Sequence, residues 1–197
     1  MFTGIVKYVA RVEHVETSAS GMRLRVQCAA ASGRLAVDDS VSVAGVCLTV
    51  IAKDADGFAV DVVPETLART TLGLARPGTA VNLELAATMD TALGGHLVQG
   101  HVDGTTQLVA RSTIGDGAAL TFQLPADLAR YVVPKGFIGL DGVSVTVAAV
   151  TADRFEVALI PHTAQHTTLG SLQPGAPVNV EVDVLAKYVE RLLEART

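Results

Sequence analysis

The side chains of this 197-residue chain that could do chemistry stand in two short runs of nearly the same sequence. GVCLTV (residues 45–50) and GVSVTV (residues 142–147) each begin with glycine and continue with β-branched residues, a pattern typical of a strand that leaves a tight bend. Because side chains alternate between the two faces of a strand, each run turns valine and leucine to one side and small polar residues to the other. The polar side carries Cys47 in the first run and Ser144 in the second. A thiol can act as a nucleophile or in proton transfer, so this difference points to function.

The two runs belong to a longer duplication in which the polar residues differ between the copies. Residues 37–86 align with residues 134–183 without a gap at an offset of 97 (142 minus 45), and the start of the chain joins at an offset of 96. Aligned pairs with different functional groups are Cys47 and Ser144, Ile5 and His101, Glu65 and His162, Arg69 and His166, and Ala86 and Asp183. Two related pockets with unlike groups suit a reaction on two like molecules in unlike roles.

General catalytic motifs are absent from the sequence, which has no dinucleotide or phosphate-binding glycine loop, no HExxH and no nucleophile elbow. His96 and His101 are five residues apart, with Asp103 nearby. On a strand two such histidines would project to opposite faces, so we do not expect a metal site. Considered singly, His101 is as well explained as a structural histidine and Cys47 as a buried cysteine, and we expect Cys28 to be a small core residue.

The duplication predicts two small domains, residues 1–93 and 94–183, followed by a separate segment, residues 184–197. Within the first copy the pattern predicts an opening strand over residues 2–15 and a short helix that begins at Pro64 and is closed by Gly73. Many short strands with turn signals about every 8–12 residues indicate an all-β fold, in which each copy forms a small closed barrel. Units of this size are marginal alone, so the halves should lean on each other or on other chains.

The last segment has helical rather than strand periodicity. Its apolar residues fall on one helical face and its charged residues on the other, which predicts an amphipathic helix with no counterpart in the first copy. The apolar residues are Val184, Leu185, Tyr188, Val189, Leu192 and Leu193. The stripe could lie across the chain's own barrels or meet copies of itself, and we favour oligomerisation.

Composition excludes several classes of function. A net charge of −5 and a pI near 5.5 argue against nucleic-acid binding, which needs a basic surface. No apolar run reaches the roughly 20 residues that a membrane span requires. The start, MFTG, lacks a signal-peptide pattern, and two cysteines provide no disulfide framework. We therefore expect a cytoplasmic protein.

Several motifs together resemble those of one enzyme family. MFTGIV, GVCLTV, LGGHLVQGHVDG, KGFIGLDGVSVTV and the two TTLG runs occur in order along the whole chain, and they are similar to riboflavin synthase of the alpha-chain type. The resemblance implies a homotrimer of tandem six-stranded barrels tied by a C-terminal helix bundle. It also implies a dismutation of two 6,7-dimethyl-8-ribityllumazine molecules, in which one gives a four-carbon unit to the other. The products are riboflavin and 5-amino-6-ribitylamino-pyrimidinedione, and neither cofactor nor metal is expected.

The same resemblance implies the site residues. Catalytic roles fall on Cys47, His101, Ser144 and Asp183. Substrate-binding roles fall on Phe2, Thr3, Gly4, Ser40, Thr49, Glu65, Thr66, Gly100, Lys135, Thr146, His162 and Thr163. In this family the site resembles an interface between chains, so we expect trimerisation to bring Cys47 against a neighbour's His101, Ser144 and Asp183. Ala44 and Leu85 depart from the family pattern, which usually has Asn and Arg at these positions.

The main alternative is a non-catalytic lumazine- or flavin-binding protein on the same fold. Such carriers tend to lose catalytic residues, whereas this chain keeps all four. A structural oligomer would leave the unlike polar pairs unexplained. Docking with a lumazine synthase partner is possible within this interpretation, and we expect neither nucleic acid nor membrane as a partner.

Overall fold

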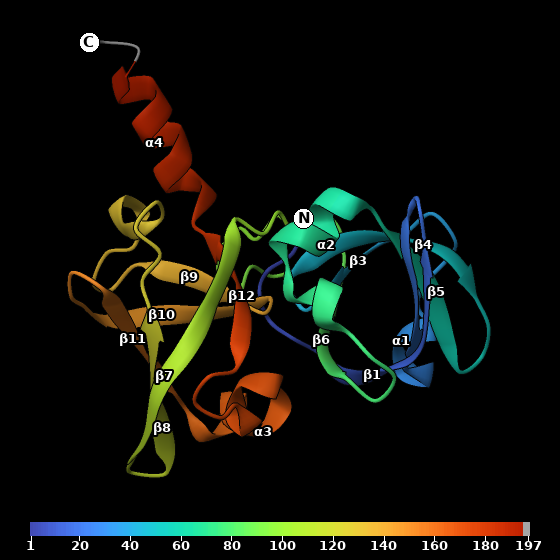
Figure 1. Ribbon diagram of the computed structural model, residues 1–197, viewed down its shortest axis with the longest axis horizontal. Helices are drawn as coiled ribbons and strands as arrows, with labels where there is room; N and C mark the ends of the chain where they lie inside the picture. Colours follow the sequence, from blue (N-terminus) through green and yellow to red (C-terminus); the bar gives the residue numbers. More distant parts are fainter. Residues whose placement is uncertain (195–197) are drawn as a thin grey trace.

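Each copy of the duplication folds into a closed barrel of six antiparallel strands, as the computed structural model shows for residues 1–194 (Figure 1). The first barrel comprises β1 (Tyr8–Ser18), β2 (Gly21–Gln27), β3 (Ser40–Val43), β4 (Val46–Lys53), β5 (Gly57–Val62) and β6 (Ala80–Leu85). The second comprises β7 (Gly104–Ile114), β8 (Gly117–Gln123), β9 (Phe137–Leu140), β10 (Val143–Val150), β11 (Arg154–Leu159) and β12 (Pro177–Val182). Closure removes the free sheet edges that an open sheet of short strands would expose.

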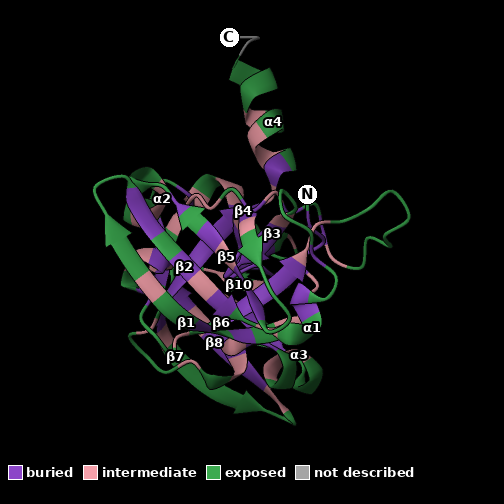
Figure 2. Ribbon diagram, turned by 90° about the vertical axis from the view of Figure 1, so that its right-hand side faces the viewer, coloured by how far each residue is buried: buried purple, intermediate pink, exposed green. Residues whose placement is uncertain are grey.

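Strand alternation produces the two cores, as the sequence predicts. In β4, Val46, Leu48 and Val50 are buried, whereas Cys47 is half-buried and Thr49 is exposed. In β10, Val143, Val145 and Val147 are buried in the same way. Figure 2 shows this alternation as buried and exposed bands along the strands. The inner faces fill the barrels with valine, leucine and phenylalanine, and the polar faces stay available for a site.

Short helices connect the strands. The predicted helix after Pro64 is confirmed as α2 (Pro64–Arg69) followed by the 3-10 turn η1 (Thr71–Leu74). The second barrel repeats it as α3 (Pro161–His166) and η3 (Thr168–Ser171). Proline opens both helices because its missing N–H is not needed in the first turn. The other short elements are α1 (Ala29–Ser32) and η2 (Ala129–Tyr131).

The predicted opening strand over residues 2–15 is wrong at both ends. The strand begins at Tyr8 and continues to Ser18, and the residues before it form a separate arm. Gly4 has a φ of +73°, a left-handed conformation that turns the chain away from the barrel. Phe2 instead pairs with Val98, far along the chain, in an isolated β-bridge.

The barrels meet at a seam where equivalent residues exchange hydrogen bonds. Asn82 donates through its side chain to the Asp141 carbonyl at 3.0 Å and accepts from the Thr168 N–H at 2.8 Å. Asn179 makes the matching bonds to the Ala44 carbonyl at 2.8 Å and from the Thr71 N–H at 2.7 Å. Both asparagines are almost fully buried, so the seam satisfies groups that would otherwise be left unpaired.

The predicted C-terminal helix is present as α4 (Val184–Glu194) and projects from the second barrel (Figure 1). Its polar side contacts the second barrel through an ion pair between Lys187 and Asp103 at 2.5 Å. Glu190 forms an ion pair with Arg130 at 2.6 Å and accepts a hydrogen bond from the Tyr131 hydroxyl. Of the predicted stripe only Val184 is buried, and the other five members are more than half exposed. The expected helix also covered residues 195–197, which lie outside the described residues. No helix within residues 1–194 is long and apolar enough to cross a membrane.

Candidate active site

Each barrel's polar strand is capped by a loop that is anchored on the other barrel. The Ser144 N–H donates to the Gly4 carbonyl at 2.8 Å, and the Cys47 N–H donates to the Gly100 carbonyl at 2.8 Å. Both glycines have positive φ, and a Cβ on either would lie within 2.6 Å of the Cβ of the reactive residue it caps. Only glycine therefore lets these loops approach the two reactive positions.

Two buried carboxylates hold the loops in place. Glu84 accepts from the N–H groups of Thr3 at 2.7 Å and Gly4 at 2.9 Å, and also from the Thr3 hydroxyl. Glu181 accepts from the N–H groups of Gln99 at 2.7 Å and Gly100 at 2.9 Å. Burial raises the pKa of both carboxyls, and the N–H donors oppose that shift.

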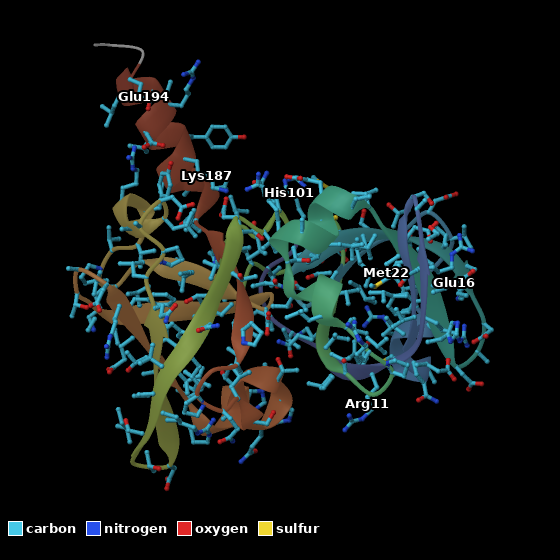
Figure 3. All side chains as sticks on the ribbon, viewed as in Figure 1. Arg11, Glu16, Met22, His101, Lys187 and Glu194 are labelled. Atoms are coloured by element: carbon cyan, nitrogen blue, oxygen red, sulfur yellow. The ribbon has the colours of Figure 1, made fainter. Side chains whose placement is uncertain are left out.

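The first barrel carries a cleft of about 200 Å³ beside Cys47. Its lining includes Glu65, Arg69, Gly100 and His101, with Glu65 paired to Arg69 at 2.5 Å. His101 is exposed and lies next to α2 (Figure 3). A thiol, an imidazole and a carboxylate thus line one opening, a set able to attack carbon or move protons.

The second barrel carries a different pair of groups at the equivalent strand. His96 Nδ1 lies 2.7 Å from Ser144 Oγ, and the imidazole is only 4% exposed. The ring stacks on Phe137, with centroids 5.3 Å apart and an interplanar angle of 8°. His96 Nε2 has no hydrogen-bond partner among the residues that the structure describes.

Burial favours the neutral form of this histidine. Desolvation lowers the pKa of His96, and the nearby negative charge of Asp183 opposes that shift. Asp183 also caps α4, where Oδ1 accepts from the Leu185 N–H at 3.0 Å. A neutral imidazole bonded to a serine hydroxyl, close to a carboxylate, can accept a proton near neutral pH.

The structure brings some of the expected site residues together and separates others. Cys47, Glu65, Thr66, Gly100 and His101 share the cleft on the first barrel, and Gly4 caps Ser144 on the second. Cys47 and His101 line one cleft of a single chain, and the expected meeting of first and second barrels from neighbouring chains stays a prediction.

The remaining expected residues lie around these two places. Phe2 and Thr3 are buried in the arm, where Phe2 pairs with Val98, and Thr3 bonds Glu84 and lines a cleft of about 400 Å³. Ser40 pairs with Thr49 across β3 and β4, and Thr146 lies opposite Phe137 across β10 and β9. Of the others, Lys135 and His162 are exposed and Thr163 is half-buried. The His162 ring stacks on the His166 ring, with centroids 4.1 Å apart.

His96 is the functional candidate that sequence reasoning missed. Comparison of the two copies could not find it, since its partner at an offset of 96 would precede Met1. The signal lay in the run GGHLVQG, where the glycines permit close packing. A Cβ on Gly95 would lie 2.8 Å from the Ser144 Cβ, so this glycine lets the chain pass directly over Ser144.

Metal binding finds no support in residues 1–194, where no group of three or more His, Cys, Asp or Glu side chains is placed to hold an ion. Neither His96 nor His101 lies in a strand, contrary to the expectation from the sequence. They are separated because His96 is buried against Ser144 and His101 is exposed beside Cys47.

Comparison with known proteins agrees with the duplication and the fold. The lumazine binding domain family matches residues 3–86 and 99–183. The chain is 48% identical to riboflavin synthase of Mycobacterium tuberculosis strain H37Rv over 199 residues, covering 99% of each chain. It is 36% identical to that of Bacillus subtilis strain 168, covering 98% of this chain and 90% of the relative.

Solved structures of LumP share the fold. The complex of LumP with riboflavin matches with a TM-score of 0.86 and 23% identity, covering 92% of this chain and 99% of that one. The complex with 6,7-dimethyl-8-(1'-D-ribityl) lumazine matches with a TM-score of 0.84 at the same identity and coverage.

Proposed function

The chain belongs to the family of lumazine-binding-domain proteins that includes the riboflavin synthases, and from this premise we propose that it makes riboflavin from 6,7-dimethyl-8-ribityllumazine. Two substrate molecules react, one gives a four-carbon unit to the other, and the second product is 5-amino-6-ribitylamino-pyrimidinedione. The reaction needs no external oxidant or reductant, because the two substrates and two products balance.

The observation that carries the proposal is the pair of related sites with different reactive groups. A thiol and an exposed histidine line one, and a serine bonded to a buried neutral histidine lies in the other. Unlike sites suit a dismutation, since one substrate molecule loses the four-carbon unit that the other molecule gains.

His96 and Ser144 form the proposed base. The C7 methyl group of the lumazine is acidic because its carbanion delocalises into an electron-poor ring. Burial favours the neutral form of His96, so it can accept that proton through the Ser144 hydroxyl, which lies 2.7 Å from Nδ1. General base catalysis of this kind contributes about 10²–10⁴-fold.

Cys47 acts on the second lumazine molecule, as a nucleophile or in proton transfer, with His101 beside it. Positioning of two large rings supplies much of the remaining acceleration, because proximity can contribute about 7–11 kcal/mol. The loops that carry Gly4 and Gly100 serve this purpose, because they fix the backbone at both reactive strands.

Assembly into a homotrimer through α4 completes the proposal. The helix is held to its own barrel by polar contacts, which leaves Leu185, Tyr188, Val189, Leu192 and Leu193 exposed. A stripe of this kind is stable in water when it meets similar stripes. The trimer then sets first and second barrels of neighbouring chains against each other, in the cytoplasm, where a lumazine synthase could supply the substrate.

The test is turnover by the purified protein with the lumazine alone. Riboflavin absorbance should appear with one product per two substrates consumed, and a chelator should not reduce the rate. His96→Gln should lower kcat by about 10²–10⁴-fold while the protein still binds riboflavin. Binding of lumazine without turnover would identify a carrier instead, and a strict requirement for added metal or nicotinamide would refute the proposal.

A further inference from the structure

We propose that Phe137 is the positioning residue of the second site, whose ring holds the His96 imidazole against Ser144 and shields it from water. The inference rests on the proposed function, because it assigns a task to the residue packed beside the proposed base. Phe137 is not among the site residues expected from the sequence.

The strand places Phe137 on the outer, polar side of the barrel. Ile138 and Leu140 of β9 are buried, so Phe137 and Gly139 point the other way. Across the β9–β10 pair they lie opposite Thr146 and Ser144 respectively. The aromatic ring therefore stands on the face that carries the reactive hydroxyl.

The two copies of the duplication differ at this position. The equivalent residue of the first copy, at an offset of 97, is Ser40, which is half-buried. Phe137 is 43% exposed, so it does not fill the barrel core. Its described ring contact is with His96, at a centroid distance of 5.3 Å and an interplanar angle of 8°.

This stack contributes to the burial of the histidine. One face of the imidazole lies on an apolar ring, and Nδ1 is fixed by Ser144. Nε2 is buried without a partner in the described part of the chain. Loss of the ring would open that face to water and reduce the desolvation that lowers the pKa of His96. The charged group acting on His96 is Asp183, whose attraction for the imidazolium opposes the desolvation and would then be offset less.

The experiment is an NMR titration of the His96 ring in the full chain, run beside the pH profile of kcat. Phe137→Ser installs the residue of the first copy, Phe137→Tyr keeps the ring, and Ile114→Ser removes an exposed apolar side chain from a distant hairpin. The His96 signal is assigned by its loss in His96→Gln. Circular dichroism checks folding, and Phe137→Leu replaces Phe137→Ser if that variant does not fold.

In Phe137→Ser the midpoint of the His96 titration should rise by about half a pH unit or more, toward the ordinary value near 6.5. The acidic limb of kcat should move by the same amount. Phe137→Tyr and Ile114→Ser should match the unmodified protein. An unchanged His96 midpoint in Phe137→Ser would overturn the inference. Because the titration needs no substrate, it gives its answer even if the protein makes no riboflavin, which would refute only the proposed function.

Discussion

Replacement of Asp141 by asparagine should make the protein more stable, and increasingly so as the pH rises. Asp141 occupies the turn between β9 and β10 with a φ of +45°, and it is buried at the seam between the barrels. Oδ1 accepts from the Asn179 N–H at 2.8 Å, and burial raises the pKa of the carboxyl from 3.8 to about 7. Asparagine can keep that bond, and Asn-Gly is a favoured pair at such turns.

The size of the effect follows from the pKa shift. A carboxyl whose pKa is raised on folding contributes stability that is fully present below its unfolded pKa and is lost as the pH rises through the folded value. The difference between 3.8 and about 7 is about 3 pH units. At 1.36 kcal/mol per unit, the unmodified protein loses up to about 4 kcal/mol of unfolding free energy from this group between pH 4 and 7. Asp141→Asn removes that loss.

The assay is urea unfolding followed by circular dichroism at pH 5, 6, 7 and 8. The gain in unfolding free energy of Asp141→Asn over the unmodified protein should grow from pH 5 to 7 and then level off. Asp116→Asn makes the same chemical change at an exposed hairpin turn and should show no such trend. A gain that is flat across this range would mean that Asp141 titrates normally, and the argument from its burial would fail.

Three other changes test the remaining parts of the argument. Cys47→Ser should reduce kcat by at least about 100-fold while the unfolding midpoint stays the same, because the thiol is on the polar face of β4; an unfolded or fully active variant would contradict this. Removal of residues 184–197 should give folded monomers in sedimentation that bind riboflavin but turn over slowly, and a fully active monomer would refute the trimer proposal. Ala44→Asn should raise the unfolding free energy by about 1 kcal/mol in urea, because alanine there has a φ of +49° and asparagine tolerates that conformation; a loss of stability would mean that the seam has no room for the amide.

The parts of the fold that depend on local pattern could be predicted from the sequence. Alternation in GVCLTV and GVSVTV assigned the buried faces of β4 and β10 correctly, because each barrel has one inside and one outside. Pro64 and Gly73 located α2 for similarly local reasons, and the duplication carried that helix over to α3. The predicted start of the opening strand was wrong because the first residues form an arm in which Phe2 pairs with Val98. No local sequence signal reports a partner about 96 residues away.

The site was predicted in part for the same reason. Comparing the copies found Cys47, His101 and Ser144, since a duplication exposes the positions where polar groups differ. It could not find His96 or Phe137. His96 has no counterpart in the first copy. Phe137 looks like a core residue until strand alternation places it on the outer face.

Each site depends on both barrels, because the loop that caps it is anchored on the other barrel. The arm that caps Ser144 is anchored by Glu84 of the first barrel, and the loop that caps Cys47 is anchored by Glu181 of the second. The two loops also bond to each other, since the Phe2 N–H donates to the Val98 carbonyl at 2.7 Å and the His96 N–H donates to the Thr3 carbonyl at 3.2 Å. These backbone hydrogen bonds link the loop that caps Ser144 directly to the loop that caps Cys47. Because a dismutation needs both substrates in place together, a fold that joins the two caps has a direct use in this chemistry.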